Sequence, residues 1–192
     1  MKAFFSENKK IIVKLILTHL VMTIFGMMVF IPFNKDDMSM KVFLIIGSAV
    51  AILLYMFLID VDMWYLGAED KLRVEAGRQK RNAGKGFLIA LCAEIPSLVI
   101  GIVYAVISML FAYYQSYPAG SALAGAKIVS WCVTFIWNGM YLGIEKISFG
   151  GGVPLVYLIA PIIPIAFSGL TYWLGLIDSP FLKPPARHKK EN

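Results

Sequence analysis

The chain has 192 residues, 59% of them hydrophobic, and a formal net charge of +6. Its mean hydropathy of +0.73 excludes an ordinary soluble domain, since such domains average about 45–50% apolar residues with glycine included. The apolar residues come in long blocks, which indicates lipid as the surrounding solvent and leaves no room for a separate soluble catalytic domain. The basic residues flank those blocks, so they predict membrane topology and contact with anionic headgroups rather than nucleic-acid binding.

The sequence predicts no cofactor and no metal site. Its two cysteines, Cys92 and Cys132, lie inside apolar blocks, so there is no CxxC pair and no zinc spacing. It has two histidines, His19 and His188, and no HExxH, GxSxG or Walker motif. An intramembrane enzyme is therefore disfavoured, and any ATP would be used by a partner protein.

The N-terminal segment predicts an uncleaved membrane span. Residues 1–14 are basic, and residues 15–33 form an apolar block of about 19 residues, enough to cross a bilayer. A signal peptide has a shorter apolar core, of about 7–15 residues, that ends at small residues. This block is longer and ends in the run FIPF, so we expect it to stay in place with the N-terminus in the cytoplasm. A polar turn at 34–41 then leads to a second span at 42–60.

Residues 61–86 form the long polar connection between the second and third apolar blocks. The segment carries six basic residues, and such a loop stays on the cytoplasmic side of a membrane. We expect a helix from Met63 to about Arg81, supported by two i,i+4 ion pairs. Two interpretations remain open: a solvated helix that only orients the protein, or a docking surface for a cytoplasmic protein or anionic lipid. The candidate docking residues are Arg73, Arg78, Lys80 and Arg81.

The third block, residues 87–114, contains an ionisable residue at depth. Glu94 lies about 12 Å along the helix axis from the start of the block, where such a side chain normally faces the protein interior or a water-filled cavity. Pro96 removes a backbone donor two residues later and can open the helix locally. Because His19 lies at a similar depth in the first span, the candidate intramembrane polar site comprises Glu94, His19 and Pro96. The alternative is that Glu94 only satisfies freed backbone groups or bonds Ser97.

Residues 123–145 are the ambiguous segment, because their apolar part has about 17 residues, the lower limit for a crossing. The last strong apolar block is 153–176, and a basic, proline-rich tail follows at 177–192. Glycines precede this block and prolines interrupt it, a pattern similar to the broken helices of transporters, whose unwound backbone binds ions or small solutes. The candidate helix-break residues are Gly150, Gly151, Gly152, Pro161 and Pro164.

The distribution of Lys and Arg favours four crossings over five. If 123–145 crosses the membrane, the basic tail lies outside. If it does not cross, the tail joins the N-terminus and the central loop in the cytoplasm, and few basic residues stay outside. Those few are Lys35, Lys41, Lys127 and Lys146. The positive-inside rule favours this second arrangement, in which 123–145 is a re-entrant or interfacial helix on the outer face. Five full spans remain the alternative.

Two stretches carry a resemblance. The run WYLGAEDK at 64–71 is followed by Lys85-Gly86 and Ile95-Pro96, and the run GLTYWLG at 169–175 precedes the basic tail. In these stretches the chain resembles small multi-pass bacterial membrane proteins of unassigned function. The resemblance implies a location in the bacterial cytoplasmic membrane and a cytoplasmic tail, and it implies no activity. The chain is also similar in size to the substrate-binding membrane subunits of vitamin transporters, but those are six-span bundles, and six spans do not fit here.

We therefore expect an all-α bundle of four membrane-crossing helices with one additional segment at the outer face. The favoured function is a small transporter, or the membrane subunit of a transport complex, because of Glu94, Pro96 and the Gly/Pro-rich last block. The alternative is a non-catalytic interaction or assembly protein, favoured by the basic loop and by the lack of a convergent polar cluster in the sequence. An intramembrane enzyme comes third.

The crossing number can be checked with reporter fusions. A fluorescent protein fused after Asn192 is expected to fold and fluoresce, and alkaline phosphatase at the same position is expected to be inactive, because four crossings return the tail to the cytoplasm. A fusion after Lys41 is the control, since that turn lies outside with either crossing number. Phosphatase activity at Asn192 would show that 123–145 crosses.

Overall fold

The computed structural model describes residues 2–30, 38–117, 120–144, 155–181 and 184. Within these ranges the chain is 86% helical and contains no strand, which confirms the prediction of an all-α protein. The elements are α1 (Lys2–Phe30), α2 (Met38–Glu75), α3 (Lys85–Tyr114), α4 (Gly120–Asn138), the 3₁₀ helix η1 (Gly139–Tyr141), α6 (Val156–Ile159) and α7 (Ile162–Leu176).

Five segments are long and apolar enough to cross a membrane, and they indicate a multi-pass membrane protein. They are Phe4–Met28, Val42–Glu75, Lys85–Tyr114, Gly120–Ile144 and Val156–Leu176. Large apolar side chains such as Leu17, Leu53 and Ile102 are exposed on their outer faces, as expected where lipid replaces water. The ambiguous segment, Gly120–Ile144, has a mean hydropathy of 1.3, against 1.6 to 2.8 for the other segments.

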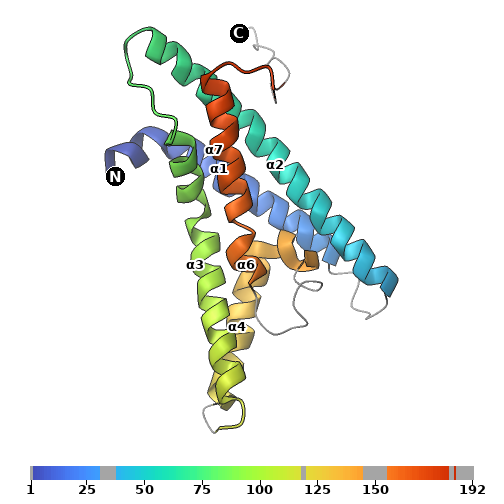
Figure 1. Ribbon diagram of the computed structural model, residues 1–192. Coiled ribbons are helices and arrows are strands. Elements are labelled where there is room, and N and C mark those ends of the chain that lie inside the picture. Colours follow the sequence, from blue (N-terminus) through green and yellow to red (C-terminus); the bar gives the residue numbers. More distant parts are fainter. Residues whose placement is uncertain (1, 31–37, 118–119, 145–154, 182–183, 185–192) are drawn as a thin grey trace.

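Helices α1 and α2 lie side by side and run in opposite directions (Figure 1). Lys14 of α1 contacts Asp62 of α2 at 2.6 Å, and the rings of His19 and Tyr55 meet further along with their centroids 5.5 Å apart. One end of the bundle therefore holds the start of α1, the end of α2, the start of α3 and the end of α7, and we call it the Lys85 end (upper in Figure 1).

Helix α2 joins two helices that the sequence predicted separately, the second span and the loop helix. It ends before the predicted end of the loop helix. It continues without a break from the second apolar block into the polar connection, over 38 residues. It stops at Glu75 rather than near Arg81, because Gly77 takes a positive φ of 68°. The N–H of Gly77 donates to the carbonyl of Val74, and that of Arg78 to the carbonyl of Arg73, which is the hydrogen-bond pattern of a glycine-terminated helix.

The extension of α2 is packed against α7 rather than solvated on all sides. Met63 and Trp64 in the extension are 0% and 4% exposed. A Cβ atom at Gly67 would overlap the carbonyl oxygen of Tyr172, and one at Gly175 would overlap the carbonyl oxygen of Trp64. Glycine at both positions therefore allows the two backbones to touch, as small residues do at membrane helix interfaces.

Helix α3 is flanked by two segments in succession. Helix α4 packs on the half that includes Tyr114, where Lys127 Nζ lies 4.7 Å from the centre of the Phe111 ring. Helix α7 packs on the other half, where Gly86 of α3 adjoins Tyr172, and α6 packs near the middle, where Tyr157 adjoins Gly101. Both segments run antiparallel to α3, so each points toward the Lys85 end (Figure 1).

Helix α4 ends level with the middle of α1. Trp137 Nε1 donates to Ser97 Oγ at 3.0 Å, and the carbonyl oxygen of Trp137 lies 2.9 Å from Nε2 of His19. At Asn138 the α-helix gives way to η1. About 18 Å of α3, from Ser97 back to Lys85, extends past this point, so α4 covers only part of the length of α3.

Beyond Asn138 the chain crosses α1 and α2. Gly139 adjoins Thr23, one turn of α1 further from the Lys85 end than the histidine. The backbone N–H of Gly143 donates to Ser48 Oγ at 2.9 Å, and Ser48 lies in the N-terminal half of α2, away from the Lys85 end. The chain therefore bends away from the axis of α4 at Asn138.

The close contact of α2 with α7 predicts a large effect of added methyl groups. Gly67→Ala and Gly175→Ala should each destabilise the protein by about 1–3 kcal/mol, because each Cβ would meet backbone atoms that cannot move without separating the helices. Gly125→Ala on α4 is the control, since nothing lies within 4 Å of that Cβ and alanine favours a helix by about 0.5–1 kcal/mol. Thermal unfolding in detergent measures both, and equal melting temperatures for all three variants would contradict the packing.

Candidate functional site

Glu94 lies inside the bundle, in the half of α3 that includes Lys85. It follows Lys85 by nine residues, about 13 Å along the helix axis. Its side chain is 2% exposed. A carboxyl group at this position has no bulk water to solvate it, so its charge and hydrogen bonds must be balanced by other protein groups.

Two side chains from other helices reach the same carboxyl oxygen. The hydroxyl of Tyr55 on α2 donates to Glu94 Oε1 at 2.6 Å. Nδ1 of His19 on α1, a side chain that is 3% exposed, lies 3.4 Å from this oxygen. The sequence matched His19 with Glu94 by depth alone, and the structure brings the two side chains together.

The other ring nitrogen of His19 is held by the tip of α4. His19 Nε2 lies 2.9 Å from the carbonyl oxygen of Trp137, and the hydroxyl of Thr23 donates to that oxygen at 2.8 Å. This carbonyl belongs to the last turn of α4, where carbonyl oxygens lack helical N–H partners. Ser97 Oγ lies 3.3 Å from Nε2. We call the group of Glu94, His19, Tyr55, Ser97 and Trp137 the Glu94 cluster.

Pro96 lies within α3, half-buried, between two members of the Glu94 cluster. Its missing N–H leaves the carbonyl oxygen of Cys92 without its usual helical bond. The helix nevertheless continues through Pro96 to Tyr114, so no break in α3 opens at this point.

A narrow void separates the Glu94 cluster from α7. Its lining includes Glu94, Pro164 and Ser168, and it has about 160 Å³ of empty space with no room for the centre of a water molecule. Glu94 Oε2 and Ser168 Oγ are buried and hydrogen bond to none of the described residues. The same holds for the hydroxyl of Tyr141 and the side-chain amide of Asn138. Such buried polar atoms are rare, and they mark places where an ion, water or a conformational change completes the bonding.

The last apolar block is interrupted beside this void. Helix α6 ends at Ile159 and α7 begins at Ile162, with Pro161 between them. Pro161 and Pro164 are both buried and neither has a backbone N–H to donate. The other candidate helix-break residues, Gly150, Gly151 and Gly152, lie outside the described residues.

A second buried ionic group joins α2, α3 and α7 near the Lys85 end. Asp70 is 0% exposed, and its Oδ2 accepts hydrogen bonds from Lys85 Nζ at 2.6 Å and from the Tyr172 hydroxyl at 2.8 Å. Its Oδ1 lies 3.4 Å from a guanidinium nitrogen of Arg73. We call these four residues the Asp70 cluster. It holds three helices together between the Glu94 cluster and the Lys85 end of the bundle.

Two residues that organise these clusters, Tyr55 and Asp70, were not predicted from the sequence. Tyr55 lies in the middle of a predicted span, whereas tyrosines of membrane proteins gather at the interfaces, and this unusual position was the available signal. Asp70 was assigned to a solvated loop helix. It follows Met63 and Gly67 at i, i+4, i+7 spacing, which places all three on one helix face.

The four candidate docking residues lie at the Lys85 end and are exposed. Arg73 pairs with Asp70 and, at 3.9 Å, with Glu69, so it contributes to the bundle as well as to its surface. Arg78 and Lys80 follow the end of α2 in irregular backbone.

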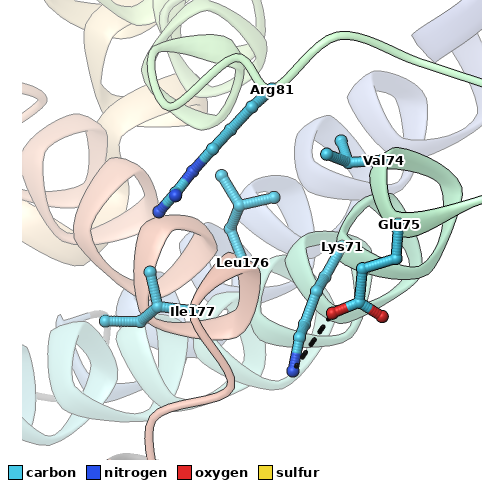
Figure 2. A pocket seen from close by; sticks show the side chains of 6 residues that line it. All are labelled: Lys71, Val74, Glu75, Arg81, Leu176 and Ile177. Atoms are coloured by element: carbon cyan, nitrogen blue, oxygen red, sulfur yellow. Dashed lines mark ion pairs between the residues drawn. The ribbon is translucent and has the colours of Figure 1, made fainter. Parts of the chain in front are cut away.

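Arg81 reaches over a surface pocket of about 320 Å³ between α2 and α7 (Figure 2). Val74, Leu176 and Ile177 supply apolar lining to the pocket. On its rim, Lys71 contacts Glu75 at 3.8 Å and Asp178 at 3.4 Å. The rim therefore carries both signs of charge.

Within the described residues, no group of three His, Cys, Asp or Glu side chains could hold a metal ion. No protein-family model, curated protein or solved structure matches the chain. The function of the Glu94 and Asp70 clusters therefore rests on their own geometry.

The Asp70 cluster predicts a strong and asymmetric response to mutation. Asp70→Asn should destabilise the protein by about 3–5 kcal/mol, because it leaves the ammonium of Lys85, whose side chain is 10% exposed, buried beside a neutral amide. The double variant Asp70→Asn/Lys85→Met should recover part of that loss, since no unpaired charge remains. Unfolding in mixed detergent micelles measures the differences.

The matched control for this experiment is Glu75→Gln. It breaks the exposed Lys71–Glu75 pair and should change the stability by less than about 1 kcal/mol. Equal losses for Asp70→Asn and Glu75→Gln would mean that the Asp70 cluster does not hold the helices together.

Proposed function

We propose that the protein lies in a bacterial cytoplasmic membrane with four crossings and both termini in the cytoplasm, and that Gly120–Ile144 is a re-entrant segment entering from the outer face. The distribution of Lys and Arg supports this topology, and so does the bend at Asn138, which leads the chain away from the axis of α4. The Lys85 end would then be cytoplasmic. The irregular backbone at the tip is covered by α1 and α2, as non-helical backbone at membrane depth requires.

Within this topology we infer that the protein is a small transporter, or the membrane subunit of a transport complex, with the Glu94 cluster as its intramembrane binding site. The observation that carries this proposal is the carboxyl group of Glu94, 2% exposed and held by α1 and α2 where the re-entrant tip arrives. Ionisable groups at such depth are costly, and membrane proteins use them in ion and substrate pathways.

The interrupted helix beside the cluster supports the same function. Transporter sites commonly lie next to discontinuous helices, whose ends rearrange when the site opens. Here Pro164, three residues after the break at Pro161, lines the void beside Glu94. The Asp70 cluster closes the path toward the Lys85 end, and the tip of α4 closes the opposite path. We interpret the structure as an occluded state, closed on both sides.

A non-catalytic interaction or assembly protein is the second candidate, and the tight packing around Glu94 favours it. The void beside Glu94 has no room for a water molecule, so the polar contacts could serve only to hold the helices together. In this role the exposed basic residues Arg78, Lys80 and Arg81 would bind anionic headgroups or a cytoplasmic partner protein.

Charge displacement on a solid-supported membrane distinguishes the two functions. Purified protein is exposed to concentration jumps of protons, of sodium or potassium ions, and of mixtures of small solutes. A transporter should give a transient current for at least one of these jumps, and Glu94→Gln should abolish it, because an amide cannot take up a proton and lacks the negative charge that balances a bound cation.

The matched control is Ser108→Ala, which removes a buried hydroxyl of α3 that bonds none of the described residues and should leave the current intact. Currents absent from the folded wild type under every jump would reject the transport proposal. A single protein recovered with it at fixed stoichiometry would then favour the assembly role.

A further inference from the structure

The carbonyl oxygen of Trp137 fixes the position of one proton on His19. A carbonyl oxygen only accepts hydrogen bonds, and it lies 2.9 Å from His19 Nε2. Nε2 must therefore carry a hydrogen. Ser97 Oγ, 3.3 Å from Nε2, is compatible with this assignment, because it already accepts the indole N–H of Trp137 at 3.0 Å and can accept a second hydrogen.

With Nε2 protonated, Nδ1 of His19 bears a hydrogen only when the ring is cationic. A neutral ring would present a bare lone pair to Glu94 Oε1, 3.4 Å away. An ionised Glu94 would present lone pairs as well. Nδ1 hydrogen bonds to none of the described residues, and two acceptors facing each other repel, so a proton bound to either group would turn this contact into an attractive one. That proton lies either on Nδ1, beside a carboxylate, or on Oε1, beside a neutral imidazole.

We propose that His19 and Glu94 bind a single proton as a pair, and that the ion handled by the intramembrane site is a proton rather than a metal cation. This inference rests on the proposed transport function and deepens it. With the proton bound the pair is formally neutral, which suits an apolar interior. After its release to water the pair carries a negative charge, and the two groups no longer attract each other.

The surroundings of the pair favour proton binding. From α1, α2 and η1 the titratable groups that face Glu94 are His19, Tyr55 and Tyr141. Described neighbours from α4 and α7 are uncharged, namely Trp137 and Ser168. The C-terminal end of α4 directs the negative pole of its helix dipole at the imidazole ring, which favours a cationic ring.

A metal cation fits poorly at the same position. The Tyr55 hydroxyl presents its hydrogen to Glu94 Oε1, and the carbonyl oxygen of Trp137 is already engaged by His19 and Thr23, whereas sodium, calcium or magnesium needs about six oxygen ligands. No group of three His, Cys, Asp or Glu side chains occurs among the described residues. The void beside Glu94 is also too narrow for a hydrated ion.

Nitrogen NMR of the histidine ring tests the inference directly. The chain has two histidines, so His188→Gln leaves His19 as the single histidine signal in ¹⁵N-histidine-labelled protein in lipid nanodiscs. We expect Nε2 to stay protonated at every pH, and Nδ1 to share one proton with Glu94 and to lose it in a single titration step. In Glu94→Gln the amide donates to Nδ1, so His19 should stay neutral and this step should disappear.

Tyr55→Phe is the second variant, because it keeps both members of the pair. The Tyr55 hydroxyl donates to Glu94 Oε1 and thereby stabilises the carboxylate. Its removal should leave the shared titration step in place and raise the proton-bound fraction of the pair at a given pH, because the carboxylate loses a donor. A lower bound fraction in Tyr55→Phe would contradict the proposed hydrogen bonding.

The outcomes separate this inference from the transport proposal. An unprotonated Nε2, or a His19 titration that is the same in wild type and Glu94→Gln, overturns the shared proton even if charge displacement is observed. A coupled titration that vanishes in Glu94→Gln supports the shared proton even if no jump produces a current. A current that responds to sodium jumps and ignores pH overturns the assignment of the ion as a proton.

Discussion

The arrangement of α1, α3 and α4 depends on the hydrogen bonds that the carbonyl oxygen of Trp137 accepts. This oxygen lies in the last turn of α4, where no helical N–H remains to bond it. In lipid no water can replace that bond, so the oxygen must find its donors within the bundle. His19 and Thr23 of α1 supply them, at 2.9 Å and 2.8 Å. The same contacts hold the tip of α4 at the depth of Glu94 and orient the imidazole ring toward the carboxyl group.

The Lys85 end of the bundle depends on a different constraint, the close approach of the backbones of α2 and α7. Glycines at 67 and 175 let α2 and α7 touch, and this contact places Asp70 within reach of Lys85 and Tyr172. Buried ion pairs gain little stability over apolar packing, but they penalise any arrangement that separates the partners. The Asp70 cluster therefore favours the one arrangement of three helices in which its partners stay in contact. It lies between the Glu94 cluster and the Lys85 end.

Together the two clusters explain how a small all-helical chain can keep ionisable groups at depth. Each buried acid is matched by a basic group from another helix, Glu94 by His19 and Asp70 by Lys85. Each also accepts a tyrosine hydroxyl from a further element. The acids are not equivalent, because the Lys85 ammonium offers only donors, whereas each ring nitrogen of His19 can be either a donor or an acceptor. This difference underlies our proposal that the Asp70 cluster holds the helices and the Glu94 cluster exchanges a proton.

The pattern of apolar blocks in the sequence predicted much of the fold. It predicted less of the candidate site. The helical class and the membrane segments were predictable, since lipid admits only self-satisfied helices or closed barrels and these blocks have helical length. Glu94 and His19 were paired correctly by depth. Tyr55 and Asp70 were not predicted, because a hydrophobic block does not specify which helix faces meet. The end of α2 was placed too late, because the turn at Gly77 was not weighed against the helical pattern that follows it.

The sequence by itself determined that this chain is a helical membrane protein with one costly carboxyl group inside an apolar span. Composition and block length suffice for that, because the transfer of side chains into lipid is a property of each segment alone. The tertiary structure decided that Glu94 faces a histidine whose Nε2 already contacts the carbonyl oxygen of Trp137, and that the chain bends away from the axis of α4 at Asn138. Both depend on contacts between residues far apart in the chain, whose directions are set only when the helices pack together.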